Sequence, residues 1–217
     1  KNIYFLPKSK YRVLLGSGVN LKNFRVKPTN NKKNTITFIM ASRLIEDKGV
    51  KEYIEAAIKI KKKYKSRCIF YLLGISDYSA RSVDRAYIQK FIKSDNINIL
   101  IDPVRVSELI KSADCSVLPT YYNEGVPKFL IESIAASNII ITTNTPGCNL
   151  GMKKYVNGFF VKTKSIYDLE MQLLRVMNIK SQDFDRMKKN SFLASKKFNE
   201  KYNIQAYKNV IISSWIV

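Results

Sequence analysis

The feature that most constrains the fold is a strand–helix–strand pattern within residues 113–149. Two short apolar segments there are separated by a loop and a helix-forming segment. The pattern predicts a strand over Asp114–Leu118, a loop ending in Glu124-Gly125, a helix with Pro127 in its first turn and a strand over Ile139–Thr143. Proline favours a helix start because its missing N–H group would have no partner there. The free N–H groups and the dipole at such a helix start can hold an anion.

The same alternation of apolar strands with amphipathic helices continues through most of the chain. Further strands are expected over Ile36–Ala41, Cys68–Leu73, Ile97–Ile101 and Phe159–Val161. Helices are expected over 50–63, 80–93, 105–112, 166–177, 183–198 and 203–216. Continuous apolar strands between helices predict a parallel sheet covered on both faces, a doubly wound, Rossmann-like α/β fold. Ligands of such sheets bind at the carboxyl ends of the strands, where the loops 42–49, 74–79, 119–126 and 144–151 are expected.

One carboxylate in the central helix needs a partner. Between Gly125 and Thr143 the only charged residues are Lys128 and Glu132, and Glu132 has apolar neighbours on nearly every face of its helix. An unpaired carboxylate buried there would cost on the order of several kcal/mol. Its donors could be backbone amides, a lysine or the hydroxyl groups of a ligand over the helix N-terminus. The spacing alone leaves these alternatives open.

Two cations follow the first strand of the expected sheet. Arg43 and Lys48 fall on the ligand-binding edge, as do the helix start near Gly125 and the turn at Pro146-Gly147. Arginine can bind two phosphate oxygens at once and lysine supplies a point charge, so this set could hold a pyrophosphate. The alternative is that both are solvated loop charges, which are common in a chain with 38 Lys and Arg residues.

Several function classes are excluded by what the sequence lacks. It has no histidine, which excludes Ser/His or Cys/His catalysis and an imidazole metal site within these residues. It has neither GxGxxG after the first strand nor GxxxxGK[ST], so a dinucleotide oxidoreductase and a P-loop ATPase are not expected. The odd number of cysteines, three, predicts reduced core thiols without a disulfide framework or a metal site. A cytoplasmic location is therefore expected.

The formal net charge of +21 has three explanations. Nucleic-acid binding is not expected, because the lysines are spread over predicted helix faces and no nucleic-acid module is visible. A peripheral contact with an anionic membrane, at the inner face of the cytoplasmic membrane, fits a basic chain without an anchor. A lysine-rich background composition is the third explanation and the main contributor, because Lys, Asn and Ile are abundant together.

Four motifs resemble one family. ASRLIEDKG, LLGISD, ADCSVLPTYYNEGVPKFLIE and TPGCN followed by VNGFFV are similar to the donor-binding, C-terminal half of retaining, GT-B-fold glycosyltransferases of the family-4 type, glycosyl transferases group 1. The resemblance runs in register over about 16–165, and its most specific part is the E-x7-E pair Glu124/Glu132 downstream of RLxxxKG. Many members assemble bacterial capsule, O-antigen and related glycans, and they typically need no metal ion. The TYYNEGVPK motif resembles enzymes that use UDP-sugars and lipid-linked acceptors.

The resemblance implies three catalytic residues. Arg43 and Lys48 would bind the diphosphate of the nucleotide-sugar donor and stabilise the charge that builds on it as the sugar departs. Glu124 would contact hydroxyl groups of the donor sugar. No cofactor and no metal ion are expected.

The resemblance also implies four donor-binding residues. Backbone amides near Gly125 and Val126 would approach the sugar and phosphate. Glu132 would accept hydrogen bonds from the ribose hydroxyls, which would supply its missing donors. Gly147 would complete the donor-binding loop after the second strand of the central pattern.

By the same analogy the chain divides into 1–34, an N-terminal remnant or linker, 35–198, the nucleotide-sugar-binding domain, and 199–217, a C-terminal helix. That helix would pack on an N-terminal acceptor domain, so we expect a half-enzyme that is active only with an acceptor domain or subunit. The sequence departs from the family at Asn149–Gly151, where a Glu is usual, and in the loop before Ser107, which lacks the usual Gly. The alternative is therefore a non-catalytic, degenerate module that binds an anionic membrane or a partner subunit.

Overall fold

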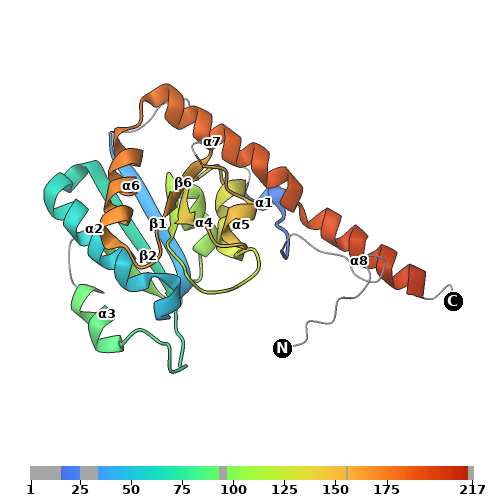
Figure 1. The fold of residues 1–217 in the computed structure, drawn as a ribbon, viewed down its shortest axis with the longest axis horizontal. Coiled ribbons are helices and arrows are strands. Elements are labelled where there is room, and N and C mark those ends of the chain that lie inside the picture. The colour runs from blue at the N-terminus through green and yellow to red at the C-terminus, as the bar shows by residue number, and fades with distance from the viewer. Residues whose placement is uncertain (1–15, 25–33, 93–96, 155, 215–217) are drawn as a thin grey trace.

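The structure is a computed structural model that describes residues 16–24, 34–92, 97–154 and 156–214. Its centre is one six-stranded parallel sheet with the order β3-β2-β1-β4-β5-β6 (Figure 1). The strands are β1 (Ile36–Arg43), β2 (Cys68–Ile75), β3 (Asn98–Ile101), β4 (Cys115–Leu118), β5 (Ile139–Thr143) and β6 (Gly158–Val161). The expected doubly wound, Rossmann-like sheet is confirmed.

Helices cover both faces of this sheet. They are α1 (Leu21–Phe24), α2 (Val50–Tyr64), α3 (Arg85–Ile92), α4 (Val106–Ser112), α5 (Lys128–Ala135), α6 (Ile166–Asn178), α7 (Ser181–Ser195) and α8 (Glu200–Ser214). Short 3-10 turns lie between them: η2 (Glu46–Lys48), η3 (Lys65–Arg67), η4 (Cys148–Leu150) and η5 (Lys196–Phe198). Helix α2 packs against α6 on one face, and α5 packs against α4 and α7 on the other (Figure 1). No helix within the described ranges is long and apolar enough to cross a membrane.

The core is densest where β1 pairs with β2. Phe38 lies opposite Phe70 in the register, and the two buried rings stack with their centroids 5.0 Å apart. Tyr53 of α2 meets the Phe70 ring edge-on, and its hydroxyl donates to the carbonyl of Tyr71 at 3.0 Å. Aromatic pairs in these geometries add to the stabilisation from apolar burial. This packing fixes β1, and with it the loop that leaves its carboxyl end.

The expected helix over 80–93 begins later than predicted. Helix α3 starts at Arg85, because Asp84 Oδ1 accepts a hydrogen bond from the backbone N–H of Ala86 at 2.8 Å and organises the first turn there. Within this helix Ala86 is exposed and Ile88 is buried. The residues before Asp84 form a loop, so a part of the chain assigned to a helix lies on the ligand-binding edge.

Pro127 is the N-cap of α5 rather than a residue of its first turn. Its ψ of 128° is extended, while its carbonyl accepts hydrogen bonds from the N–H groups of Leu130 and Ile131 at 3.0 and 3.2 Å. An N-cap has this combination of non-helical dihedrals and a carbonyl that is already bonded to the helix. The helix start nevertheless lies where the sequence placed it, directly after the loop that carries Glu124 and Gly125.

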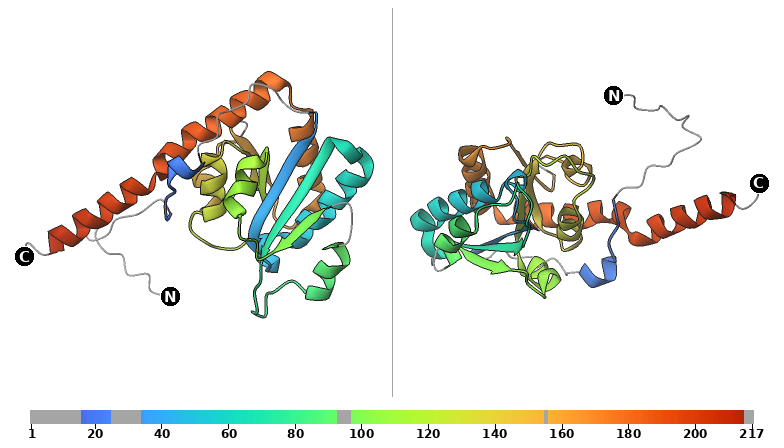
Figure 2. Two further views of the ribbon diagram at one scale, coloured as in Figure 1. Left: turned by 180° about the vertical axis from the view of Figure 1, so that it is seen from behind. Right: turned by 90° about the horizontal axis from the view of Figure 1, so that it is seen from below.

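Helix α8 projects beyond the sheet and its covering helices, as all three views show (Figures 1 and 2). At its base the backbone N–H of Val19 donates to the carbonyl of Phe198, and the N–H of Glu200 donates to the carbonyl of Val19. Its exposed side chains include three large ones: Tyr202, Ile204 and Tyr207. The described part of the expected N-terminal segment is thus attached to the base of α8, and most of 1–34 lies outside the described residues.

Candidate functional site

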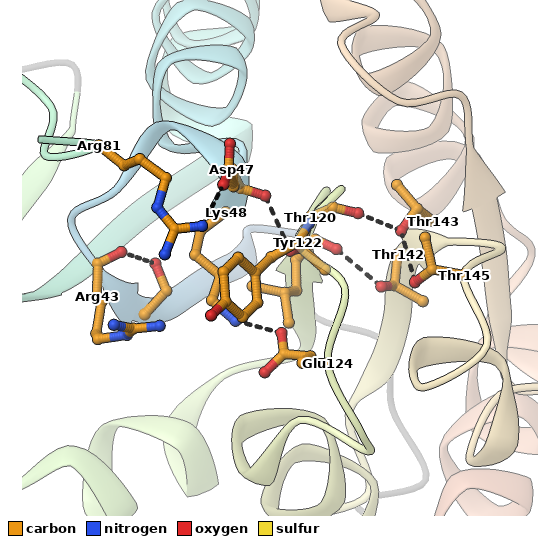
Figure 3. Close-up of polar contacts among 12 residues, drawn as sticks. Arg43, Asp47, Lys48, Arg81, Thr120, Tyr122, Glu124, Thr142, Thr143 and Thr145 are labelled. Carbon is orange, nitrogen blue, oxygen red and sulfur yellow. Dashed lines mark hydrogen bonds and ion pairs between the residues drawn. The ribbon is translucent and has the colours of Figure 1, made fainter. Parts of the chain in front are cut away.

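The strand order reverses between β1 and β4, which are neighbours at the centre of the sheet. From β1 the chain continues to β2 on one side, and from β4 it continues to β5 on the other. The loops that leave the two strands therefore diverge, and this is the position where doubly wound sheets bind ligands. The loop after β1 carries Lys48, and the loop after β4 carries Tyr122 and Glu124 (Figure 3).

The two loops are held together by their backbones. The carbonyl of Asp47 accepts from the N–H groups of Tyr121 and Tyr122 at 2.8 and 3.0 Å, and from the Thr120 hydroxyl at 3.0 Å. Gly49 has a φ of 75°, and a Cβ there would lie 2.6 Å from the carbonyl oxygen of Pro119. Both the dihedral and the close approach require glycine. The side chains that leave these loops therefore start from a fixed frame.

Lys48 and Glu124 form an ion pair across this frame (Figure 3). The Lys48 side chain is 8% exposed and that of Glu124 is 24% exposed. The ammonium also lies 4.8 Å from the centre of the Tyr122 ring. A charge removed from water needs such partners, because a buried, unpaired ammonium is strongly disfavoured. The sequence placed both residues in the site, and the structure brings them into contact.

Arg43 and a second arginine, Arg81, lie over the same ring. Their guanidinium carbons are 5.5 and 5.1 Å from the centre of Tyr122. Each also pairs with a carboxylate at 3.2 Å, Arg43 with Asp77 and Arg81 with Asp47. Hydrogen bonds from Arg43 and Arg81 lower the pKa of the Tyr122 phenol. Arg43 is therefore no isolated surface charge, although its side chain is 43% exposed.

The sequence did not single out Arg81, Asp77, Asp47 or Tyr122. Arg81 and Asp77 belong to the loop after β2, and the expected helix from residue 80 hid the place of Arg81 on the ligand edge. Tyr122 stands within the conspicuous TYYNEG segment, but nothing in the sequence indicates that cations gather on its ring. One signal was available: all four residues follow strands whose carboxyl ends share one edge.

Gly147 brings the loop after β5 against the loop that carries Glu124. A Cβ at Gly147 would lie 2.1 Å from the carbonyl oxygen of Gly125 and 2.5 Å from that of Glu124. Around Gly125 itself a Cβ would meet nothing within 4 Å. Val126 turns its side chain inward with Leu130 of α5 and other apolar residues. Gly147 thus acts by close packing, Gly125 faces open space, and Val126 offers its backbone rather than its side chain.

Hydroxyl groups fasten β5 to the loop after β4. Thr142 Oγ1 donates to the carbonyl of Leu118 at 2.8 Å, and Thr143 Oγ1 donates to the carbonyl of Thr120 (Figure 3). Both threonines are fully buried. Their hydroxyls satisfy carbonyls that a parallel strand pair leaves at its end. These bonds fix the first part of the loop that carries Glu124 against the end of β5.

Glu132 lies apart from this cluster in its contacts. The sequence left three possible partners for Glu132: backbone amides, a lysine or the hydroxyl groups of a ligand. The structure shows a lysine, since Lys128 Nζ is 3.7 Å from Glu132 Oε1. That distance makes an ion pair but exceeds a hydrogen bond. Lys128 is 71% exposed and Glu132 only 17%. Burial raises the pKa of Glu132 above its ordinary value of 4.5, and the charge of Lys128 only partly opposes this. Within the described residues no hydrogen bond or ion pair joins Glu132 to the Lys48–Glu124 pair.

The described residues contain no group of three or more His, Cys, Asp or Glu side chains that could hold a metal ion. The three cysteines, Cys68, Cys115 and Cys148, are free and buried. The charged groups of the site are instead cations paired with single carboxylates. Such a set suits an anionic ligand that takes hydrogen bonds from arginine and lysine.

Comparison with known proteins decides the family. The pattern of the family described as glycosyl transferases group 1 matches residues 22–193, most of the chain. The chain belongs to this family. A relative from Campylobacter jejuni, named N,N'-diacetylbacillosaminyl-diphospho-undecaprenol alpha-1,3-N-acetylgalactosaminyltransferase, is 27% identical over 179 residues, which cover 77% of this chain and 45% of the relative.

Solved structures of other proteins share the fold of this glycosyl transferases group 1 domain. HepE of Anabaena, in complex with UDP, superimposes with a TM-score of 0.74 at 16% identity, covering 90% of this chain and 56% of HepE. The C-terminal domain of LpcC, a group 1 protein of Francisella tularensis, gives 0.65 at 22% identity and covers 82% of this chain and 96% of that domain. The expected C-terminal half of a GT-B fold is confirmed. The chain spans about half the length of the first two proteins.

The departures from the family are built into local hydrogen bonds. In the loop before Ser107, Asp102 adopts a φ of 46°. Its carboxylate accepts from the N–H and hydroxyl of Ser76 at 2.9 and 2.8 Å, which compensates for a dihedral that glycine adopts more easily. Within Asn149–Gly151, the second departure, Asn149 donates through Nδ2 to Asn144 Oδ1 at 3.1 Å.

Proposed function

We propose that this chain is the nucleotide-sugar-binding half of a retaining glycosyltransferase that uses a UDP-sugar in bacterial surface glycan assembly. The observation that carries the proposal is the convergence of Arg43, Lys48 and Glu124 at the reversal of strand order. HepE, which shares the fold, was solved with UDP. The Campylobacter relative is named as a transferase for a diphospho-undecaprenol-linked sugar, which supports a lipid-linked acceptor.

Arg43 and Lys48 would bind the donor diphosphate. Lys48 has three N–H donors and shares one side of its ammonium with Glu124, which leaves donors for phosphate oxygens. Arg43 uses Nη1 for Asp77 and keeps further N–H groups of its fork. When the sugar leaves, negative charge accumulates on the diphosphate. Fixed cations therefore stabilise the transition state more strongly than the bound donor in its ground state. This is their catalytic role in the proposal.

Glu124 would orient the sugar while it holds Lys48. A carboxylate has acceptor sites for about four hydrogen bonds, so pairing with one lysine leaves room for sugar hydroxyls. Gly125 faces open space, so a sugar or phosphate can approach its amide without meeting a side chain. The amide of Val126 would follow at the mouth of α5, and Gly147 would keep this loop in place by its contact with Gly125.

Glu132 would accept hydrogen bonds from the ribose. Its side chain is only 17% exposed, burial raises its pKa, and among the described residues its ion-pair partner is the exposed Lys128 at 3.7 Å. The carboxylate oxygens of Glu132 can accept further hydrogen bonds from hydroxyl groups of a ligand, and these bonds would stabilise its negative charge. Perturbed carboxyl groups of this kind are typical of functional sites.

Helix α8 would carry the contact with the acceptor half. It projects from the 35–198 domain and exposes Tyr202, Ile204 and Tyr207, which would be covered by an acceptor domain or subunit (Figure 2). In this proposal residues 199–217 bridge the two halves and 1–34 lead into the domain. Activity would require both halves, because only their closure excludes water from the donor.

Calorimetry with UDP and a panel of UDP-sugars tests the proposal. We expect weak binding by this chain, and a loss of about tenfold or more for Arg43→Ala and for Glu132→Ala, since each would remove a charge-assisted hydrogen bond to the ligand. Arg186→Ala and Glu170→Ala are matched controls, because they remove the same charges from ion pairs with Asp183 and Lys59 elsewhere. Equal losses in the controls, or no binding of any nucleoside diphosphate at millimolar concentration, would reject the proposal.

The second candidate is a non-catalytic module for an anionic membrane or a partner subunit. It is favoured by the departure at Asn149–Gly151, where the family usually has a Glu, and by the exposed apolar residues of α8. Flotation with phosphatidylglycerol vesicles in the absence of nucleotide distinguishes the candidates. Co-flotation together with silent nucleotide titrations would select the membrane module.

A further inference from the structure

Three cations share one aromatic ring in this site. Lys48 Nζ and the guanidinium carbons of Arg43 and Arg81 lie 4.8, 5.5 and 5.1 Å from the centre of the Tyr122 ring (Figure 3). We call these four residues the Tyr122 cluster. Each cation also has a carboxylate partner: Glu124, Asp77 and Asp47 respectively. Three positive charges, two from the end of β1 and its loop and one from the loop after β2, repel one another, so the arrangement needs these partners and the negative face of the ring.

The hydroxyl group of Tyr122 points to the side of the cluster on which Arg43 and Arg81 lie (Figure 3). Hydrogen bonds from Arg43 and Arg81 lower the pKa of the phenol, which favours its anionic form. Two guanidinium groups directed at one oxygen are an arrangement that proteins use for carboxylate and phosphate oxygens. The neutral tyrosine thus receives the hydrogen bonds that an oxyanion would receive more strongly.

Arg81 is held at this place by the backbone around it. Its carbonyl accepts from the N–H of Glu46 at 3.0 Å, and Ile45 and Ser82 form an antiparallel bridge. The loop after β2 is therefore fastened to the loop that carries Lys48. The backbone of Arg81 is therefore fixed by the loops after β1 and β2, although its side chain is 53% exposed.

The backbone of Tyr122 is fixed while its side chain is only half-buried. Its N–H donates to the carbonyl of Asp47 at 3.0 Å and to the hydroxyl of Thr120 at 3.1 Å. Rotation about the side-chain bonds can therefore move the phenol without disturbing the loop.

We propose that the Tyr122 hydroxyl occupies the position of a phosphate oxygen, and that a diphosphate displaces it and binds Arg43, Lys48 and Arg81 together. Tyr122 keeps the three cations in place until the anion arrives. Arg81 becomes a third phosphate-binding residue, supplied by the loop after β2. The cluster itself requires only that the ligand is a diphosphate. That the ligand is a nucleoside diphosphate rests on the proposed function.

The first test measures the affinity for inorganic pyrophosphate and for UDP by calorimetry. Arg81→Gln should weaken both ligands about tenfold, because a charge-assisted contact is lost. The control is Arg85→Gln, which removes the same charge at the start of α3, where Arg85 lies over the ring of Tyr78. Equal affinities of Arg81→Gln and the unaltered protein, or an equal loss in the control, would overturn the role of Arg81.

The second test changes the oxygen and keeps the ring. Tyr122→Phe retains the aromatic face but removes the group that competes with the ligand, so we expect pyrophosphate and UDP to bind about three- to tenfold more tightly. Structural damage would instead weaken binding, and so would the loss of a hydroxyl that donates to the ligand. Either weaker or unchanged binding would refute the displacement. The control is Tyr121→Phe. Tyr121 is the residue before Tyr122 and its ring lies near Lys164, so this change should leave both affinities unaltered.

A spectroscopic measurement follows the displacement directly. With 13Cζ-labelled tyrosine, the Tyr122 resonance, assigned by its absence in Tyr122→Phe, should move toward that of an ordinary phenol when UDP is added. No movement at saturating UDP would refute the displacement. Binding of UDP that depends on Arg43 and Glu132 but not on Arg81 or Tyr122 would refute this inference and leave the proposed function standing. Binding of pyrophosphate through Arg81 without binding of UDP would do the reverse.

Discussion

Glu124 and Glu132 belong to one E-x7-E motif but have opposite surroundings. Glu124 lies in the loop after β4 and pairs with Lys48, whose side chain is 8% exposed. Glu132 lies one turn into α5, and its partner is Lys128, whose side chain is 71% exposed, at 3.7 Å. The first glutamate neutralises a charge that the fold has buried. The second is itself the buried charge, and burial raises its pKa.

The two glutamates should therefore affect the stability of the folded chain in opposite directions. Removing Glu124 would leave a lysine without a partner in a dry place, so the residue is needed by the fold as well as by a ligand. Removing the charge of Glu132 would relieve the folded chain, and in our proposal the ribose of the ligand accounts for this charge. The predictions below test this contrast, beginning with the largest effect.

Breaking the Lys48–Glu124 pair should have the largest effect. We expect Glu124→Ala to cost about 2–3 kcal/mol in the free energy of unfolding, somewhat below the value for a fully buried pair because Glu124 is partly exposed. That corresponds to a fall of about 4–12 °C in melting temperature for a chain of this size. Thermal and urea unfolding measure it. The double variant Lys48→Met/Glu124→Ala should recover most of the loss, and a double variant as unstable as the sum of the singles would contradict the pairing.

Two glycines beside Glu124 should respond in opposite ways to the same change. Gly147→Ala would put a methyl group 2.1 Å from the carbonyl oxygen of Gly125, and such overpacking costs about 1–3 kcal/mol. Gly125→Ala meets nothing within 4 Å and should stay within about 0.5 kcal/mol of the unaltered protein. Urea unfolding compares the two. Gly125→Ala should nevertheless weaken UDP-sugar binding, and a stable variant with unchanged affinity would argue against ligand approach at Gly125.

Neutralising Glu132 should stabilise the free chain slightly. Glu132→Gln is expected to raise the melting temperature by about 1–3 °C at neutral pH and to weaken UDP binding. The folded-state pKa is raised, so the folded chain holds more protons and loses stability as pH rises above 4.5, the ordinary value. The gain of the variant should therefore disappear in acid, below the ordinary pKa. Unfolding curves over a pH series measure it, and a gain that does not depend on pH would show that the charge is not its cause.

The smallest effect is expected at Lys128. Lys128→Ala removes the only ion-pair partner of Glu132 among the described residues. Because this lysine is mostly exposed, the free energy of unfolding should change by no more than about 0.5 kcal/mol. UDP should bind about two- to threefold more tightly if ribose hydroxyls and Lys128 compete for Glu132. Calorimetry decides this, and weaker binding would show that Lys128 helps the ligand instead.

The elements with strong periodicity could be predicted from the sequence. The strand Ile139–Thr143 has the predicted bounds, and β1, β2 and β6 differ from prediction by no more than two residues at either end. The start of α3 was wrong by five residues, because its position depends on the Asp84 cap rather than on apolar spacing. That error also concealed Arg81.

The sequence by itself determined the fold class and the loops of the ligand-binding edge, because apolar periodicity and turn residues act locally along the chain, and its motifs indicated the family by resemblance. Tertiary structure alone decided which charges meet. The loops after β1, β2 and β4 bring Lys48, Arg43 and Arg81 to one Tyr122 ring, and only the parallel sheet gives those loops a common edge. Ion pairs between residues far apart in sequence depend on distances of a few ångströms and on exclusion of water, and neither is encoded in local composition.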